Sequence, residues 1–362
     1  MAGFTGVKWA PVQMYYNLNE KHFEIVKDAG KVPGVSRSVH YGIFLAFEGI
    51  RFFCKKEDGE LKIRLLNWDK NLQRFIRSMS FNLSREQQTL VPTQDELVNV
   101  FVQKFLACPE MRPFLEEMAE MGAQGYLRPY TVDEDQSIGV TFPVKPTIRA
   151  VVCRYESYLG EPFSGVVIPH MVRAMGINGT GHLKLGVNYL ISIKAVDEAK
   201  RIFPGASSAL FLDDQPHIPL EERKITEWDS SCCLIALRNG TVIKIPESPL
   251  ILPSVTINGM VAILRDMGVN VEERDVTYGE LIEKAKAEEI VAITSVGTAG
   301  IMNRCSKLLL VDGKEGKELA LQEADEEHTL FKQLGEAKAR YWDIYRGEAE
   351  PAPGMELFEY WL

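Results

Sequence analysis

The chain has 362 residues, of which 46% are hydrophobic and 25% are charged. This composition excludes a disordered protein, and the length leaves room for two domains, each with its own core. The net charge of −9 comes without any long basic run, so we expect neither nucleic acid nor an anionic membrane surface as a main partner. No segment approaches the roughly 18 apolar residues of a membrane span.

The N-terminal segment and the cysteines favour a cytoplasmic protein. The first 30 residues contain no apolar block flanked by positive charge, so no secretory signal is predicted. The cysteines lack CxxC spacing, and two of them are adjacent, which favours reduced thiols over a disulfide framework and predicts no metal site. They are Cys54, Cys108, Cys153, Cys232, Cys233 and Cys305.

The first half of the chain mixes helical and strand-like segments. Apolar residues at helical spacing predict a helix over 67–81, and Thr93 is the expected N-cap of a second helix over 94–108. The predicted strands are residues 49–55 and 61–66, around a turn at 57–60, and residues 147–156.

Residues 161–182 are rich in Gly and Pro, and we interpret them as the connection between two domains, 1–160 and 183–362. Beyond this connection, Asn239-Gly240 joins two β-rich runs and predicts a hairpin with a type I′ turn. The other predicted helices are 188–203, 255–268, 279–289 and 330–347, and the other predicted strands are 208–213, 270–277 and 290–295.

These segments do not alternate regularly as strand, helix, strand. The fold class predicted is therefore α+β, with two α+β domains rather than one doubly wound parallel sheet.

A lysine among glycines raises the question of chemistry. Gly176 to Gly181 has the glycine spacing of a phosphate-binding P-loop, but His182 occupies the lysine position of that motif. A dinucleotide fingerprint also fails, because GTGHLK lacks its third glycine. Lys184 is then either a surface lysine or a desolvated amine able to form a Schiff base, and this stretch alone leaves both open.

Eight short motifs between residues 40 and 300 give the chain a resemblance to the branched-chain aminotransferases, fold-type IV enzymes that use pyridoxal 5′-phosphate (PLP). The segment LKLGVNY is similar to the family form K-x-G-G-N-Y, with Val187 in place of one glycine. The motifs, in the family's order, are HYGIFLAFEGIR, NLQRFIRS, YLRPY, SYLG, HLKLGVNY, ITEWDSS, ILPSVT and SVGTAG. The resemblance implies a smaller N-terminal domain and a larger C-terminal domain that binds PLP.

By this resemblance, Lys184 is the lysine that forms the Schiff base and moves the proton, which requires an amine that is neutral part of the time. Glu227 matches the carboxylate that favours a protonated pyridine nitrogen, and Tyr189 matches the tyrosine that hydrogen-bonds the phenolic oxygen. Taken alone, Glu227 would be a solvated charge. The residues implied for the phosphate are Arg74, Val255, Thr256, Gly297 and Thr298.

The substrate positions follow from the same resemblance. Ala299 and Ser230 match positions that hold the α-carboxylate of the substrate. Arg128 is expected to pair with the second carboxylate of glutamate. Three further positions match residues around the substrate side chain, the last of them reaching in from a partner subunit: Phe47, Tyr158 and Tyr41.

Departures from the family pattern cluster where the substrate is recognised. The run GIFLA has one residue more than expected, WDSSC follows the Glu of ITE, and Ser254 and Ile257 replace a usual Gly and a usual Arg. Only Cys305 remains of the CxxC motif that mammalian relatives carry. The pattern therefore predicts the cofactor more firmly than the substrate.

The implied function is a ping-pong exchange of an amino group between a branched-chain or related hydrophobic L-amino acid and 2-oxoglutarate, in a homodimer. Other fold-type IV enzymes stay open: a D-amino-acid or amine transaminase, an aminodeoxychorismate lyase or a specialised-metabolism transaminase. The alternative of a different class is a catalytically silent PLP-binding or regulatory protein. Because a site that had lost its chemistry would no longer need Lys184, the complete residue set favours an enzyme.

Overall fold

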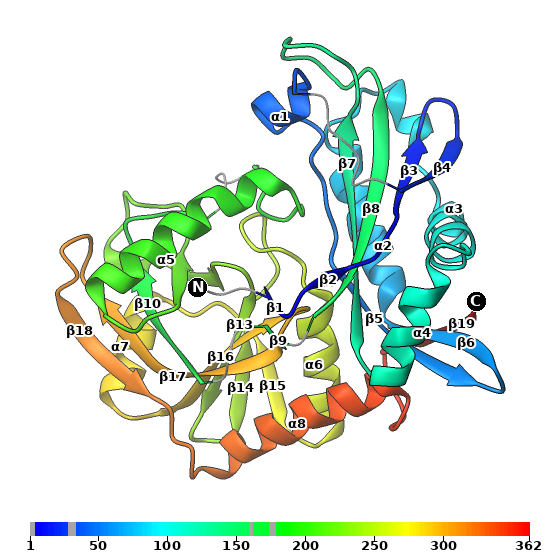
Figure 1. Cartoon of the computed structure of the whole chain (residues 1–362). Helices are drawn as coiled ribbons and strands as arrows, with labels where there is room; N and C mark the ends of the chain where they lie inside the picture. The colour runs from blue at the N-terminus through cyan, green and yellow to red at the C-terminus, as the bar shows by residue number, and fades with distance from the viewer. Residues whose placement is uncertain (1–3, 28–33, 156, 159–161, 174–178) are drawn as a thin grey trace.

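The computed structural model describes residues 4–27, 34–155, 157–158, 162–173 and 179–362. For residues 4–5 and 157–158 it describes the main chain alone. The chain forms two lobes, each built on its own sheet (Figure 1). Within the described ranges, every helix is too short or too polar to cross a membrane.

The first lobe is an antiparallel sheet with the strand order β19-β6-β5-β7-β8-β3-β4, and β2 pairs with β8. Aliphatic and aromatic side chains from the sheet and its helices, Phe52, Trp68 and Phe75 among them, form its core. The bounds are β2 (Lys8–Trp9), β3 (Gln13–Asn17), β4 (His22–Val26), α1 (Arg37–Tyr41), β5 (Ile50–Glu57), β6 (Glu60–Leu66), α2 (Trp68–Ser80), α3 (Gln94–Val98), α4 (Arg112–Met121), β7 (Gln124–Asp133), β8 (Pro146–Arg154) and β19 (Leu357–Trp361). A separate pair of short strands is β1 (Phe4–Thr5) with β9 (Ser157–Tyr158).

The second lobe is a mixed sheet with the order β12-β11-β10-β17-β16-β13-β14-β15, and β18 pairs with β17. The bounds are β10 (Phe163–Ile168), α5 (Leu190–Ile202), β11 (Ser208–Leu212), β12 (Ile225–Trp228), β13 (Cys232–Leu237), β14 (Thr241–Lys244), α6 (Val255–Asp266), β15 (Asn270–Glu273), α7 (Tyr278–Lys286), β16 (Ile290–Gly297), β17 (Ile301–Val311), β18 (Glu318–Glu323) and α8 (Thr329–Arg346). The architecture confirms the α+β class, because each lobe combines hairpins with packed helices.

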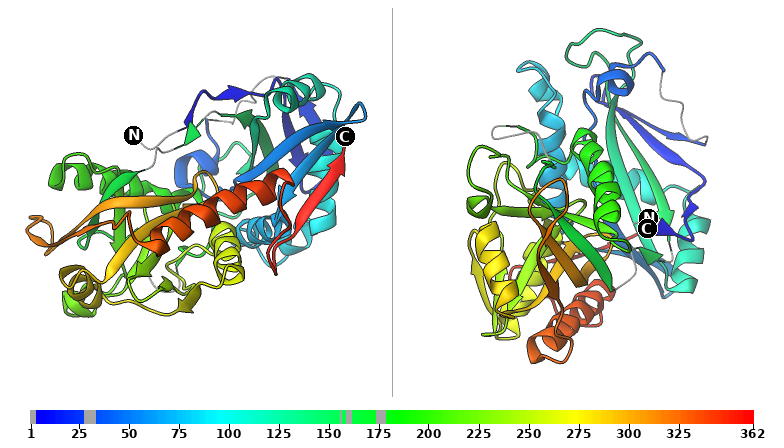
Figure 2. Two further views of the ribbon diagram at one scale, coloured as in Figure 1. Left: turned by 90° about the horizontal axis from the view of Figure 1, so that it is seen from below. Right: turned by 90° about the vertical axis from the view of Figure 1, so that its left-hand side faces the viewer.

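The end of the chain returns to the first lobe. Helix α8 runs from the second lobe to the first, and β19 then pairs antiparallel with β6, with Leu357 opposite Leu66 (Figure 2). The sequence grouped these residues with the second domain. In the structure, β19 belongs to the sheet of the first lobe. It pairs with β6, whose outer N–H and C=O groups would otherwise lie at an unpaired edge of that sheet.

The proposed connection 161–182 also contains a core strand. Strand β10 pairs with β11 on one side and β17 on the other, and its residues Val166, Val167 and Ile168 are fully buried. The neighbouring Gly and Pro residues concealed this short apolar run. Residues 161 and 174–178 of the proposed connection lie outside the described residues.

The helix predicted over 94–108 is present from Gln94 to Leu106, but only its first part is α-helical. Helix α3 begins after Thr93, whose side chain and that of Glu96 form a reciprocal capping box. From Asn99 to Leu106 the chain is a π-helix in which five of eight residues are buried. A wider turn gives this apolar stretch a broader buried face than an α-helix would.

The hairpin β13–β14 is present, but its turn is not of type I′. Three residues, 238–240, separate the strands, and of Asn239 and Gly240 only the glycine has a positive φ, at 89°. A type I′ turn requires positive φ at both central residues, whereas a three-residue loop uses a single left-handed residue.

Candidate active site

A cavity of about 390 Å³ lies at the junction of the two lobes. Its volume falls within the range of roughly 300–1,000 Å³ that is usual for small-molecule sites. The residues that line it include seven of the predicted site residues: Phe47, Arg128, Lys184, Tyr189, Ser230, Thr298 and Ala299.

Lys184 belongs to the first lobe through its main chain and its neighbours. Leu183 and Leu185 are buried in the core of that lobe, and the carbonyl of Lys184 accepts a hydrogen bond of 3.0 Å from the N–H of Phe47. The amine lies 3.2 Å from the hydroxyl of Tyr189 and over the ring of Phe47. Burial of both flanking leucines thus turns the lysine side chain into the cavity.

Tyr189 is the phenol beside this amine. Burial opposes ionisation of the phenol, but the positive charges of Lys184 and Arg173 outweigh burial and lower the pKa of Tyr189 below its ordinary value. The guanidinium of Arg173 also lies over the tyrosine ring, 5.2 Å from its centroid. Tyr189 can therefore hold a hydrogen bond to an oxygen anion or to the amine.

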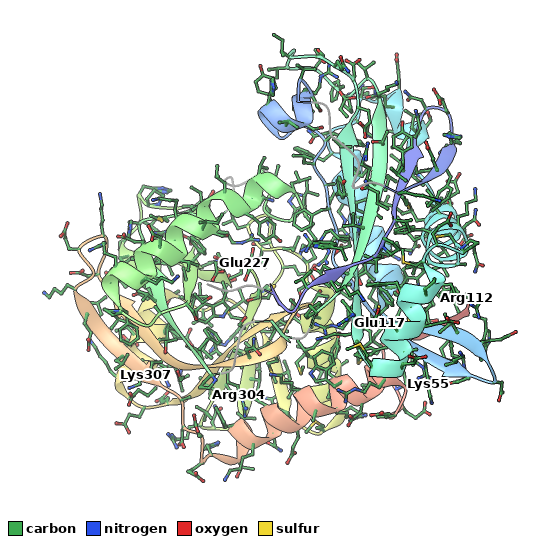
Figure 3. The ribbon with its side chains drawn as sticks, viewed as in Figure 1. Lys55, Arg112, Glu117, Glu227, Arg304 and Lys307 are labelled. Carbon is green, nitrogen blue, oxygen red and sulfur yellow. The ribbon has the colours of Figure 1, made fainter. Side chains whose placement is uncertain are left out.

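Glu227, in β12, is a buried carboxylate with 1% of its surface exposed, and Figure 3 labels it in the second lobe. One carboxylate oxygen accepts from Arg173 at 2.6 Å and from the N–H of Leu252 at 3.2 Å. The other oxygen has the weak thiol donor of Cys232 at 3.9 Å. Burial raises the pKa of Glu227 to about 7, although the cation of Arg173 opposes this. The second oxygen can accept from a cationic N–H.

Arg74 and the start of α6 form an end of the site suited to an anion. Arg74 donates two hydrogen bonds to the buried carboxylate of Glu48, at 2.8 and 2.6 Å, and one to the carbonyl of Pro253 at 2.7 Å. These bonds use three of its five N–H groups. Pro253 leads directly into α6, where Val255 and Thr256 occupy the first positions and have N–H groups without intrahelical partners.

The turn 298–300, between β16 and β17, completes this end. The hydroxyl of Thr298 lies 3.4 Å from that of Thr256. The carbonyls of Thr298 and Ala299 accept hydrogen bonds from the buried guanidinium of Arg51. Because Arg51 holds these carbonyls, the turn keeps a fixed orientation, and Gly297 immediately before it is the last residue of β16.

Arg128 lines the cavity beside Phe47. It donates to the hydroxyl of Tyr126 at 2.9 Å, and its guanidinium lies 4.9 Å from the ring centroid of Phe47. Tyr126 and Arg128 are two apart in β7, so they lie on the same face of the strand. This pair can bind a carboxylate.

Six predicted site residues do not line the cavity itself: Arg74, Glu227, Val255, Thr256 and Gly297, described above, and Tyr41. Tyr41 is 48% exposed, and its hydroxyl donates to the carbonyl of Ile138. Tyr158 lies in β9, of which the main chain alone is described.

Sequence reasoning missed Tyr126, Arg173, Glu48 and Arg51. Strand alternation in YLRPY could have indicated Tyr126, because it shares a face with Arg128. The other three are charged residues that pair with groups far away in the sequence, and no local pattern signals such pairs. Among the described residues, no group of three His, Cys, Asp or Glu side chains is placed to hold a metal ion.

The site contains the chemical groups that binding of PLP requires. An arginine and a helix start lie at one end, and a buried carboxylate with one weakly bonded oxygen lies beside an arginine. An amine and a phenol lie in the cavity between the lobes. The residues present therefore fit a phosphorylated cationic heterocycle that carries an aldehyde.

Comparison with known proteins gives a consistent set of relatives. No family model matches the chain. A probable branched-chain-amino-acid aminotransferase of Staphylococcus aureus is 25% identical over 321 residues, covering 88% of this chain and 80% of the relative. Branched-chain-amino-acid aminotransferase 6 of Arabidopsis thaliana is 28% identical over 332 residues, covering 86% and 84%.

Solved structures share the fold. A branched-chain aminotransferase of Thermoproteus uzoniensis with norvaline has a TM-score of 0.66 at 19% identity, covering 94% of this chain and 96% of that one. The Escherichia coli branched-chain amino acid aminotransferase has a TM-score of 0.66 at 20% identity, covering 95% and 98%. A third, a T.th. branched-chain amino acid aminotransferase complexed with N-(5′-phosphopyridoxyl)-L-glutamate, has a TM-score of 0.65 at 17% identity and covers 93% and 95%.

Proposed function

We propose that this chain, which has the fold of the branched-chain aminotransferases and is related to them in sequence, is a PLP-dependent aminotransferase. It exchanges an amino group between a branched-chain or related hydrophobic L-amino acid and 2-oxoglutarate. The observation that carries this proposal is the position of Lys184 in the cavity, with its amine 3.2 Å from the phenol of Tyr189.

Different residues would hold different parts of the cofactor. Arg74, Thr298 and the first N–H groups of α6 would hold the phosphate, and the weakly bonded oxygen of Glu227 would face the pyridine nitrogen. When bound, PLP supplies an electron sink for charge that develops on the substrate carbon. Glu227 favours a protonated pyridine nitrogen because an ionised carboxylate stabilises a neighbouring cation.

Lys184 performs the proton transfer in this proposal. Its amine can take a proton from the α-carbon of a bound amino acid and hold it for return, since it lies on a flexible side chain above the ring of Phe47. The oxygen of Tyr189 accepts a hydrogen bond from the amine, which the cations of Arg173 and Lys184 favour, and its O–H can donate to an oxygen anion. The N–H groups of the turn 298–300 and the hydroxyl of Ser230 would orient the α-carboxylate.

A ping-pong exchange requires one cavity to accept two different side chains in turn. The aromatic rings of Phe47, Tyr126 and Tyr189 offer an apolar surface to an aliphatic side chain. Arg128 offers a cation to the second carboxylate of glutamate and 2-oxoglutarate. One pocket can thus serve both partners of the reaction.

Replacing Arg128 with alanine should affect these two substrates unequally. The second carboxylate of 2-oxoglutarate needs a partner once it leaves water, whereas leucine brings an apolar side chain. We expect the KM for 2-oxoglutarate to rise tenfold or more, on the order of 1.4 kcal/mol, with a much smaller change for leucine. Rates of the two half-reactions, measured separately, check this, and equal losses would mean that Arg128 only supports the scaffold.

Arg74 requires a variant designed around its ion pair. Substitution with alanine would leave the Glu48 carboxylate buried without its cation, at a cost of about 3–5 kcal/mol in stability. The double variant Arg74→Gln/Glu48→Gln removes both charges together. We expect its Kd for PLP to rise about ten- to a hundredfold, because a charge-assisted phosphate contact contributes roughly 1.5–3 kcal/mol.

A spectroscopic titration of the apoprotein with PLP measures this Kd. The matched control is Arg37, which forms a buried ion pair with Asp133 in the first lobe. The corresponding double amide variant at Arg37 and Asp133 should leave PLP affinity unchanged. An unchanged affinity in the Arg74 variant as well would place the phosphate elsewhere.

The exposed apolar side chains support a homodimer. Val39 and Tyr41 on α1, Ile138 and Val140 after β7, and Leu190 at the start of α5 are each between 48% and 73% exposed. A Cβ added at Gly42, the C-cap of α1, would lie 2.7 Å from Val187 Cγ1, so α1 lies beside the segment that leads into α5. A second copy that covers this surface would remove the apolar side chains from water, and Tyr41 would then reach the partner's cavity.

A screen of amino donors against 2-oxoglutarate tests the proposed function. The protein should be yellow when purified with PLP, lose this colour on addition of a donor, and regain it with the oxo acid. Turnover with valine, leucine or isoleucine supports the proposal. Turnover restricted to D-amino acids or amines would assign another reaction of the same fold, and a colour that no donor changes would indicate a binding protein.

A further inference from the structure

We infer that Ser78 is a positioning residue that fixes the main chain of Lys184 relative to that of Arg74. The inference rests on the proposed function, because it assigns Ser78 a role toward the same two residues. Ser78 does not line the cavity, and 1% of its surface is exposed. It would act through Lys184 and not on a substrate.

The hydroxyl of Ser78 connects two segments far apart in the chain. It accepts a hydrogen bond of 2.9 Å from the N–H of Lys184. It donates one of 2.8 Å to the carbonyl of Arg74, one turn earlier in α2. A single hydroxyl therefore links the main chain of the lysine to the main chain of the arginine.

Three further main-chain contacts of the lysine segment come from a different part of the first lobe. The N–H of Phe47 donates to the carbonyl of Lys184, Leu185 forms a β-bridge with Ala46, and the N–H of Gly186 donates to Leu45. These contacts fix the segment against residues 45–47. Ser78 supplies the contact to α2, and its hydroxyl bonds the main chain of Lys184 and that of Arg74 directly.

This link has a consequence for a ligand that both residues hold. PLP carries its aldehyde and its phosphate on one rigid ring, so the amine and the guanidinium must keep a matching separation. Shifts of about 0.5 Å are enough to weaken a constellation of this kind. Without Ser78, the N–H of Lys184 would lose its partner, and the segment could shift relative to α2.

The chain offers a matched control in the same helix. Ser80 also donates from its hydroxyl to the carbonyl four residues earlier, that of Ile76, at 2.8 Å. Ser78→Ala and Ser80→Ala therefore each remove one bond from a hydroxyl to the carbonyl four residues earlier in α2. Only Ser78→Ala also removes the bond to Lys184. Ser78→Thr keeps a hydroxyl at the position and serves as the rescue variant.

The first measurement uses the apoprotein and is independent of catalysis. We expect amide hydrogen exchange at Lys184 to accelerate about tenfold or more in Ser78→Ala, since the free energy of one hydrogen bond corresponds to roughly a decade. Exchange there should remain slow in Ser80→Ala and in Ser78→Thr. Equal exchange at Lys184 in both alanine variants would overturn the inference.

The second measurement is the affinity of the apoprotein for PLP, followed by absorbance. We expect Kd to rise about five- to tenfold in Ser78→Ala and to stay at the wild-type value in Ser80→Ala. Inorganic phosphate, which needs Arg74 but not Lys184, should bind all three proteins alike. If wild-type protein takes up no PLP, the proposed function fails. If wild-type binds PLP and the two alanine variants do not differ, only the role of Ser78 fails.

Discussion

Replacing Lys184 with alanine should abolish transamination and leave the fold intact. The amine is the group placed to transfer the proton, and general acid–base catalysis together with covalent attachment accounts for at least about a thousandfold in rate. Lys184 is half-buried, and its amine has one hydrogen bond, to Tyr189. Its loss should therefore change the free energy of unfolding by no more than about 1 kcal/mol.

Steady-state turnover and thermal unfolding of the same preparations check both parts of this expectation. Lys194→Ala is the matched control, because Lys194 lies in α5 nearby in sequence, is exposed and pairs with Asp197 on the surface. It should have wild-type turnover. If Lys184→Ala keeps wild-type turnover, the assignment of the catalytic lysine is wrong.

Replacing Glu227 with glutamine should slow turnover by about a hundredfold or more. A neutral amide cannot stabilise a cationic pyridine nitrogen as a carboxylate does, and removing one electrostatic group from an active site costs about 10²–10³ in rate. Measured at saturating donor and acceptor with PLP in excess, this loss should be in kcat. Unchanged kcat would mean that another group faces the cofactor ring.

The substitution Glu227→Gln should also change how the free energy of unfolding of the apoprotein depends on pH. The pKa of Glu227 is raised to about 7 in the native state from an unfolded value of 4.5. Between these values the native state holds a proton that the unfolded state has released, so stability falls with rising pH. This loss in the free energy of unfolding is complete above pH 7 and reaches about 3 kcal/mol.

Glu227→Gln has no such titration. Its stability relative to wild type, measured by denaturant unfolding of the apoproteins, should therefore improve by about 3 kcal/mol between pH 4.5 and pH 8. The comparison across pH cancels the pH-independent cost of leaving Arg173 without its carboxylate. A difference that stays constant across this range would contradict a raised pKa for Glu227.

The sequence predicted which residues share the candidate site but did not indicate the contacts between them. Lys184, Tyr189 and Arg128 were placed by short motifs, and the cavity contains all three. Arg173 and Glu227 are 54 residues apart, and nothing in either neighbourhood indicates that they share a buried hydrogen bond. Pairs of this kind depend on how strands and loops meet, which periodicity does not encode.

The same limit applied to the fold. Helices with a clear apolar period and a capping residue, such as α6 with Ser254 as its N-cap, were predicted within a residue or two. Strand β10 was missed because its apolar run is short and lies among Gly and Pro residues. Strand β19 was missed because its partner, β6, lies almost 300 residues earlier in the chain.

The pairing of β19 with β6 makes the two lobes inseparable as folding units. A fragment that ends near residue 160 would leave the N–H and C=O groups of β6 at an open edge, where other chains could add strands. The ion pair between Arg64 and Glu359 would be lost with it. The sheet of the first lobe is thus completed only after the second lobe has been synthesised.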